Sequence, residues 1–266
     1  NQHHFAAFME MTVGLTLAAV FAGAVTRDKR ALYGIALALM MIAVIMTGSR
    51  GGIIGVFAVM AFVVAAVYFT ARPGPELDRR TTGLKLGLGA AAILVVVLAG
   101  VLFLSGADPI VRGIGLQGGQ ADVTSGRMHF WSIALKIFFE HPIFGAGFDA
   151  FGVAFTRFDT WNGYFRVEQA HNDYLQILAD GGILAFGAVA AFIFLLFKRA
   201  LCVIRRSSSP GRRTVAIGAL AGCFGILVHS FFDFPLRTAS NSYFFLLLAA
   251  LATIDLGDER EEKGDT

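Results

Sequence analysis

Cysteine and charge are both scarce in this sequence of 266 residues. It contains two cysteines, and charged residues make up 15% of the chain. Cys202 and Cys223 both lie outside the longest polar segment, residues 105–173. A disulfide framework, or a zinc site built from cysteine thiolates, is therefore excluded in that segment. We expect both cysteines to be packing residues.

Apolar residues dominate what is present. They account for 56% of the chain, and the mean hydropathy is +0.67, which is well above the values of soluble domains. A helix needs roughly 20 mostly apolar residues to cross the hydrocarbon of a bilayer. The sequence therefore predicts an all-α polytopic membrane protein with about seven spans. They are expected at residues 5–25, 31–48, 52–71, 86–104, 174–197, 214–233 and 240–254.

The basic residues predict the topology. Most lysines and arginines follow the first, third and fifth expected spans, whereas the short gaps between the others hold only Arg50 and Arg237. The positive-inside rule places the basic gaps and the acidic tail, residues 255–266, in the cytoplasm, so residues 105–173 face outward. The chain starts without Met, and nothing like a signal peptide precedes the first span, so we expect a portion of a longer membrane protein.

The outward segment combines glycine-rich turns with one helical pattern. From residue 125 to 140, Trp131, Leu135 and Phe138 or Phe139 recur at helical spacing. Thr124 or Ser125 is the expected cap, and Pro142 ends the pattern. The pattern predicts an amphipathic helix lying in the membrane interface, and by itself it leaves open whether this helix does more than anchor the segment.

Two polar motifs lie beside the expected spans. Arg50 lies in the turn Thr47-Gly-Ser-Arg-Gly-Gly, where a charge near hydrocarbon must be paired, solvated or extended to lipid headgroups. His171 and Asn172 precede the fifth span, and Asn172 or Asp173 can cap that helix. A histidine suits general acid or base chemistry near neutral pH, and a purely structural role is the alternative.

The remaining polar pattern concerns His229 and Asp233. They are four residues apart near the end of the sixth expected span, so we expect their side chains to contact each other, as a structural hydrogen bond or in support of a site. The outward segment has no His-x-x-x-His pair and no closely spaced acidic doublet. This spacing predicts no metal site.

Five motifs together resemble the O-antigen ligase and polymerase superfamily. They are Asn1-Gln-His-His-Phe-Ala-Ala, Thr47-Gly-Ser-Arg-Gly, Ser125-Gly-Arg with Trp131, His141-Pro-Ile-Phe-Gly-Ala-Gly-Phe and His171-Asn-Asp-Tyr-Leu-Gln. The resemblance covers nearly the whole chain, in matching order. Because members of the family carry additional N-terminal spans, it implies that the chain is a C-terminal portion.

The resemblance implies a function and a site. Family members transfer a glycan from undecaprenyl diphosphate to an acceptor at the periplasmic face of the bacterial inner membrane, without a metal or other cofactor and with inversion at the sugar. Arg50, Arg127 and His171 match the family's functional residues. The arginines would bind the departing diphosphate in place of a divalent cation, and His171 would take the acceptor's proton or position the acceptor. We further predict substrate contacts from Asn172, Gly145 and Gly147, with His229 and Asp233 supporting the site.

The acceptor defines several alternatives. We expect a ligase with a lipid A core acceptor, and keep an O-antigen or exopolysaccharide polymerase and a protein O-oligosaccharyltransferase open. The expected partners are the lipid-linked glycan, a glycan or lipid A core acceptor, and membrane lipids, with no nucleic acid. A lipid-linked glycan transporter is less favoured, because transporters tend to place ionisable residues in the middle of spans, whereas these candidates gather on one side of the membrane.

Overall fold

The computed structural model describes residues 1–22, 25–70, 126–161 and 166–254, together with a few helical residues between 83 and 93. All regular structure in this part of the chain is helical. The helices are α1 (Gln2–Phe21), η1 (Arg27–Lys29), α2 (Arg30–Met46), α3 (Arg50–Thr70), α6 (Arg127–Glu140), α7 (Phe151–Phe158), α8 (Asp173–Arg206), α9 (Pro210–His229), η2 (Pro235–Arg237) and α10 (Ala239–Thr253). Most of the span expected at 86–104 lies outside the described residues.

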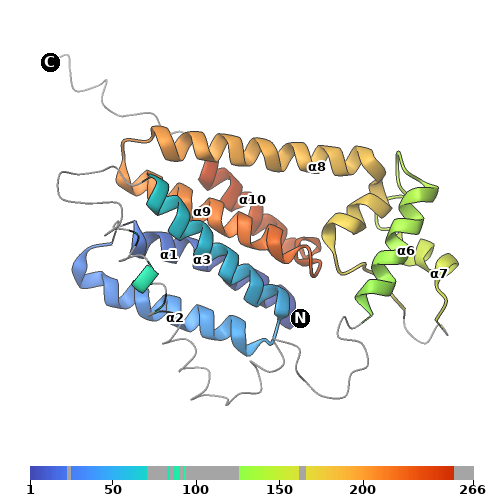
Figure 1. Cartoon of the computed structure of the whole chain (residues 1–266), viewed down its shortest axis with the longest axis horizontal. Coiled ribbons are helices and arrows are strands. Elements are labelled where there is room, and N and C mark those ends of the chain that lie inside the picture. The colour runs from blue at the N-terminus through green and yellow to red at the C-terminus, as the bar shows by residue number, and fades with distance from the viewer. Residues whose placement is uncertain are drawn as a thin grey trace.

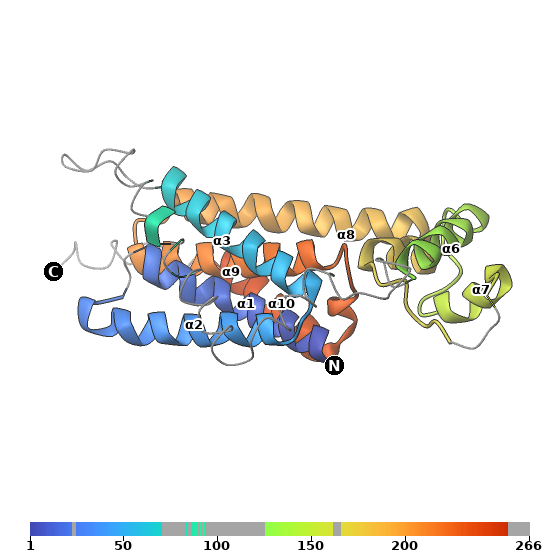
Figure 2. The same ribbon diagram turned by 60° about the horizontal axis from the view of Figure 1, so that its bottom comes forward.

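Six helices form a lengthwise bundle, and two pack beyond one of its ends. Figure 1 shows α1, α2, α3, α8, α9 and α10 along the long axis, with α6 and α7 at the end where the chain begins. The turned view in Figure 2 shows the same separation. We call the end of the bundle beside α6 and α7 the loop end. Helices α1, α3, α8 and α9 are long and apolar enough to cross a membrane, and α2 and α10 are shorter apolar helices. The expected polytopic all-α class is confirmed.

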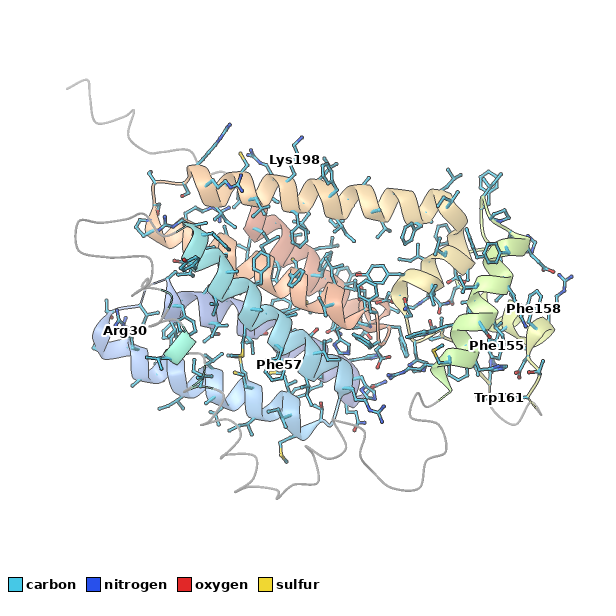
Figure 3. The ribbon with its side chains drawn as sticks, in the orientation of Figure 1. Arg30, Phe57, Phe155, Phe158, Trp161 and Lys198 are labelled. Carbon is cyan, nitrogen blue, oxygen red and sulfur yellow. The ribbon has the colours of Figure 1, made fainter. Side chains whose placement is uncertain are left out.

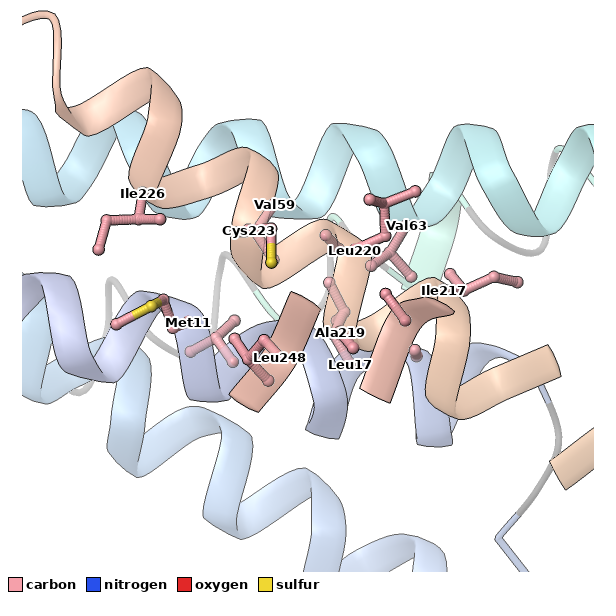
Figure 4. Close-up of a cluster of buried hydrophobic side chains, with 14 of the residues drawn as sticks. Met11, Leu17, Val59, Val63, Ile217, Ala219, Leu220, Cys223, Ile226 and Leu248 are labelled. Carbon is pink, nitrogen blue, oxygen red and sulfur yellow. The ribbon is translucent and has the colours of Figure 1, made fainter. Parts of the chain in front are cut away.

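Helix α9 lies at the centre of the bundle because small residues let its neighbours approach closely. A Cβ on Gly14 of α1 would lie 2.6 Å from the carbonyl oxygen of Gly218, and one on Gly222 would lie 2.6 Å from that of Met11. Small residues at such crossings allow backbone-to-backbone packing between membrane helices. Figure 4 shows the apolar side chains that surround this contact, among them Leu17, Val59, Leu220 and Leu248.

Helix α8 is interrupted near its start, although the sequence predicted one uniform span at 174–197. Gly182 has φ 63° and ψ −163°, which no helix contains. The interruption exposes backbone groups that residues 142–147 satisfy. Ile183 N–H donates to the Pro142 carbonyl at 2.8 Å, and Ala146 N–H donates to the Ala179 carbonyl at 2.8 Å. The first two turns of α8 therefore belong to the loop end, and only the remainder runs along the bundle.

Two further boundaries differ from the sequence-based prediction. Helix α9 begins at Pro210 and ends at His229, rather than covering 214–233, so Asp233 lies in the following turn. Helix α6 begins after Gly126, whose φ of 81° suits glycine. The buried face of α6 consists of Ile133, Ala134 and Ile137, which pack with α7 residues, so the predicted aromatic stripe is not the side that faces the protein.

The glycine contacts predict a difference between two matched substitutions. Gly222→Ala inserts a methyl group against the backbone of α1, and overpacking of this kind costs about 1–3 kcal/mol. Gly34→Ala makes the same chemical change in α2, where nothing lies within 4 Å of the new Cβ. We expect a lower midpoint of thermal unfolding in detergent for Gly222→Ala alone. Equal midpoints for both variants would contradict the close packing.

Candidate active site

Asp233 is the meeting point of residues from four separate segments. Its Oδ1 lies 3.0 Å from Nδ1 of His171, and its Oδ2 lies 3.6 Å from Nη2 of Arg127 and 3.7 Å from Nδ1 of His3. The Phe234 N–H donates to Oδ1 at 3.0 Å. The cluster therefore joins α1, the start of α6, the residue before the α8 cap and the turn after α9, all at the loop end.

The charge of Asp233 follows from these neighbours. Burial raises the pKa of the carboxyl group, but the hydrogen bond and charge of His171, with the charges of His3 and Arg127, outweigh it and lower the pKa to about 2. Asp233 is only 3% exposed. A carboxylate that stays ionised while shielded from water can orient a histidine and stabilise its protonated form.

His171 is held in a fixed orientation by its backbone, by the capped start of α8 and by the turn that contains Phe234. Its φ of 51° is unusual for a residue other than glycine. The next residue, Asn172, caps α8 by accepting from the N–H groups of Tyr174 and Leu175 at 3.0 and 3.1 Å. The His171 ring packs against Phe234 with centroids 4.8 Å apart, and 34% of its side chain is exposed. With Nδ1 facing Asp233, Nε2 forms the opposite edge of the ring, where no described residue is bonded to it.

Arg127 and Arg50 bring positive charge to the same cluster. Burial lowers the pKa of the Arg127 guanidinium, the Asp233 carboxylate opposes that shift, and the nearby charge of Arg50 adds to it. The start of α3, where Arg50 lies, is tied to the cluster through Ser49, whose Oγ lies 3.0 Å from Nδ1 of His3. The three residues matched by the family resemblance thus come together at one end of the bundle.

His229 has a different partner from the one the sequence predicted. Its Nδ1 lies 3.1 Å from both carboxylate oxygens of Glu10, and both side chains are fully buried. The predicted side-chain contact with Asp233 is wrong, because α9 ends at His229 and Asp233 turns toward His171. A side chain on Gly51 would overlap the His229 ring, and one on Gly55 would overlap the Glu10 carboxylate. The buried pair therefore fixes the start of α3.

Asn172, Gly145 and Gly147 occupy structural positions. Besides capping α8, the Asn172 side chain donates to the Phe231 carbonyl at 3.1 Å. Gly147 N–H donates to the Asp180 carbonyl and Gly145 N–H to the His141 carbonyl, both at 2.9 Å. The two glycines have φ values of 119° and 68°. The Gly147 N–H thus holds the loop on α8, whereas the Gly145 N–H closes the turn that follows α6. Substrate contact by Asn172, Gly145 and Gly147 stays a prediction.

A second polar network, which the sequence reading missed, joins the loop to the bundle. Arg237 donates to Asp180 Oδ2 at 3.0 Å and to Asp149 Oδ1 at 2.9 Å. Asp180 Oδ1 also accepts from the Phe151 N–H at 2.9 Å, at the start of α7. Acidic residues inside apolar stretches, such as Asp180 and Glu10, are the sequence signal for such pairs. Within the described part of the chain, no group of three or more His, Cys, Asp or Glu residues is placed to hold a metal ion.

The sequence was also compared with models of known protein families. The profile of the O-antigen ligase family matches residues 35–190. The chain belongs to the O-antigen ligase family. It is therefore a membrane glycosyltransferase of the ligase and polymerase group. The matched range includes Arg50, Arg127 and His171 and ends before Asp233. A search of curated proteins found no match.

The buried Glu10–His229 pair predicts strong coupling between the two positions. Removing one partner, as in Glu10→Met, leaves a buried group unpaired and is expected to cost about 3–5 kcal/mol. Replacing both, as in Glu10→Met with His229→Leu, leaves no unpaired group and is expected to recover most of that loss. Thermal unfolding of the single and double variants in detergent measures the coupling. Additive losses in the double variant would contradict it.

Proposed function

We propose that the protein transfers a glycan from an undecaprenyl diphosphate carrier to an acceptor hydroxyl at the periplasmic face of the inner membrane. The favoured acceptor is the lipid A core, which makes the protein an O-antigen ligase. One observation supports this most: at the loop end, Asp233 contacts both His171 and Arg127, and the charge of Arg50 lies nearby. The site thus combines a candidate proton acceptor with candidate diphosphate ligands.

The two arginines suit the leaving group. A diphosphate gains negative charge as its bond to the sugar breaks, and guanidinium groups bind phosphate oxygens with two parallel hydrogen bonds. Arg127 lies 3.6 Å from Asp233 and its side chain is 21% exposed, so it is close to the site and reachable by a ligand. Positive groups fixed before the reaction stabilise developing charge without reorganisation. In this proposal they do the work that a divalent cation does elsewhere.

His171 completes the reaction. The acceptor oxygen attacks the anomeric carbon from the side opposite the diphosphate, and the carbon–oxygen bond to the phosphate breaks with its electron pair leaving on the diphosphate. The acceptor's proton passes to Nε2 of His171, whose Nδ1–H is directed at Asp233. The carboxylate holds the tautomer that leaves Nε2 free to accept and stabilises the imidazolium that forms. Attack from the opposite side inverts the configuration of the sugar.

The dyad predicts that its two members act together. His171→Ala and Asp233→Asn are each expected to lower the transfer rate about 10²–10⁴-fold, as losses of general base catalysis do. The double variant should be little worse than either single variant, because the carboxylate acts through the imidazole. The measurement is glycan transfer from a purified lipid-linked donor to lipid A core in detergent. Multiplying losses would contradict a shared role.

His141→Ala is the matched control for these variants. His141 is an exposed histidine of the same outward segment, and α6 separates it from Arg127 by roughly 20 Å at a rise of 1.5 Å per residue. It should retain the parental rate. If His141→Ala reduces transfer as much as His171→Ala does, the assay reports folding of the segment rather than chemistry.

The arginines are distinguished by a conservative substitution. Arg127→Lys and Arg50→Lys keep the charge but lose the planar pair of donors that matches a diphosphate. We expect each to lower the transfer rate by about tenfold or more, a loss of about 1.4 kcal/mol in transition-state stabilisation. A chelator should leave the parental rate unchanged if guanidinium groups replace a cation. Loss of activity in EDTA, restored by Mg²⁺, would overturn the metal-independent mechanism.

The acceptor is tested by the product that accumulates in a deletion strain. Loss of a ligase leaves long glycan chains on the carrier lipid, whereas loss of a polymerase leaves single repeats attached to the lipid A core. We expect the first result. The second would identify a polymerase while leaving the roles of His171 and the arginines in place.

A further inference from the structure

A group of exposed apolar side chains surrounds the interruption in α8. We call it the apolar rim, and it consists of Ile143, Phe144, Phe148, Ile183 and Leu184. Phe148 is 87% exposed and Phe144 is 74% exposed, and the other three are at least half exposed. Large apolar side chains gathered in this way on an outer surface mark a contact with another apolar phase.

The backbone around the rim is held firmly. Besides the bond from Ile183 to Pro142, the Leu184 N–H donates to the Ile143 carbonyl at 3.4 Å, and Gly147 N–H donates to Asp180. A Cβ on Gly181 would lie 3.4 Å from a ring carbon of Phe148, so that ring adjoins the interruption. The exposure of these side chains is therefore fixed by the fold.

The rim continues the exposed apolar side of α8, a candidate membrane span. Ile183 and Leu184 lie on the same side of α8 as Phe194 and Leu195, because eleven residues make about three helical turns. Phe194 is 65% exposed and Leu195 is 58% exposed on this membrane-spanning helix. Figure 1 shows this part of α8 running along the outside of the bundle from the interruption at the loop end. The exposed apolar side of the span thus leads directly into the rim.

The length of α8 places the rim at the edge of the hydrocarbon. Residues 183–197 are all uncharged, and Lys198 is the first charge beyond them. At 1.5 Å per residue they cover roughly 22 Å, whereas the hydrocarbon core is about 30 Å thick. The aliphatic part of the Lys198 side chain can cover part of this difference at the opposite interface. Apolar residues at Ile183 or beyond it must cover the several ångströms that are left. The rim supplies apolar surface at that level.

A polar boundary follows directly. Asp149, the residue after Phe148, has a side chain that is 80% exposed and binds Arg237. The surface thus changes from apolar to charged within one residue, as is typical where a protein leaves the hydrocarbon for the headgroups.

We propose that the apolar rim is inserted among the lipid acyl chains of the membrane leaflet at the loop end, and that it anchors α6 there. The molecules in contact with the rim are the bulk lipids of the bilayer. The anchor differs from the interfacial helix expected at 125–140, since the inserted side chains belong to the loop after α6 and to α8. Because the loop continues from the C-terminal end of α6, the anchor holds that end of the helix at the membrane surface.

Site-directed spin labelling tests the proposal in the full protein reconstituted into phosphatidylcholine bilayers. Nitroxides are placed singly at residues 144 and 148 through Phe144→Cys and Phe148→Cys, with Cys202 replaced by Ser and the fully buried Cys223 left in place. Collision with oxygen, which concentrates in hydrocarbon, is compared with collision with the water-soluble complex NiEDDA. Leu195→Cys is the lipid reference, and Thr156→Cys, on an exposed position of α7, is the aqueous reference.

We expect the ratio of oxygen to NiEDDA collisions at 144 and 148 to be several-fold above that at 156 and to approach that at 195. A ratio equal to that at 156 would place the rim in water and overturn the proposal. Low collision rates with both reagents would overturn it as well, because they indicate a rim covered by protein. Neither result depends on catalysis, so the outcome is separate from that of the transfer assays.

Discussion

The carboxylate of Asp233 is the constraint on which the candidate site depends. A nearly buried negative charge is costly unless cations and N–H donors surround it. His171, Arg127, His3 and the Phe234 N–H meet that need from four parts of the chain. The same contacts that stabilise the carboxylate therefore orient the histidine and hold one guanidinium group, so folding and the proposed chemistry rest on one interaction.

Close packing in the bundle determines where the remaining charge lies. Glycines on α1, α3 and α9 let three helices approach until backbones touch, and Gly51 and Gly55 leave space for the His229–Glu10 pair. That pair packs directly against the start of α3. Since Arg50 is the first residue of α3, the buried Glu10–His229 pair helps to set its position. Small residues therefore determine the position of the site as much as charged residues do.

The interruption of α8 has two consequences for the loop end. Its freed backbone groups hold the loop at residues 142–147, and the loop in turn holds α6 across the end of the bundle, as Figures 1 and 2 show. Figure 3 shows the aromatic side chains Phe155, Phe158 and Trp161 gathered in this outer part, away from Lys198 on the other end of α8. Gly145 allows the loop and α8 to approach closely, since a Cβ there would overlap the backbone of Asp180.

The sequence by itself determined the fold class, since apolar runs of membrane-spanning length permit little else, and its motifs singled out Arg50, Arg127 and His171 as candidates. It placed most helix ends within a few residues. Only the tertiary structure decided the pairings, because they join residues that are far apart along the chain. Helical spacing paired His229 with Asp233, but the end of α9 at His229 turned Asp233 to His171 and left His229 to Glu10. A local pattern carries no information about which helix lies opposite, and that is set by packing of the whole bundle.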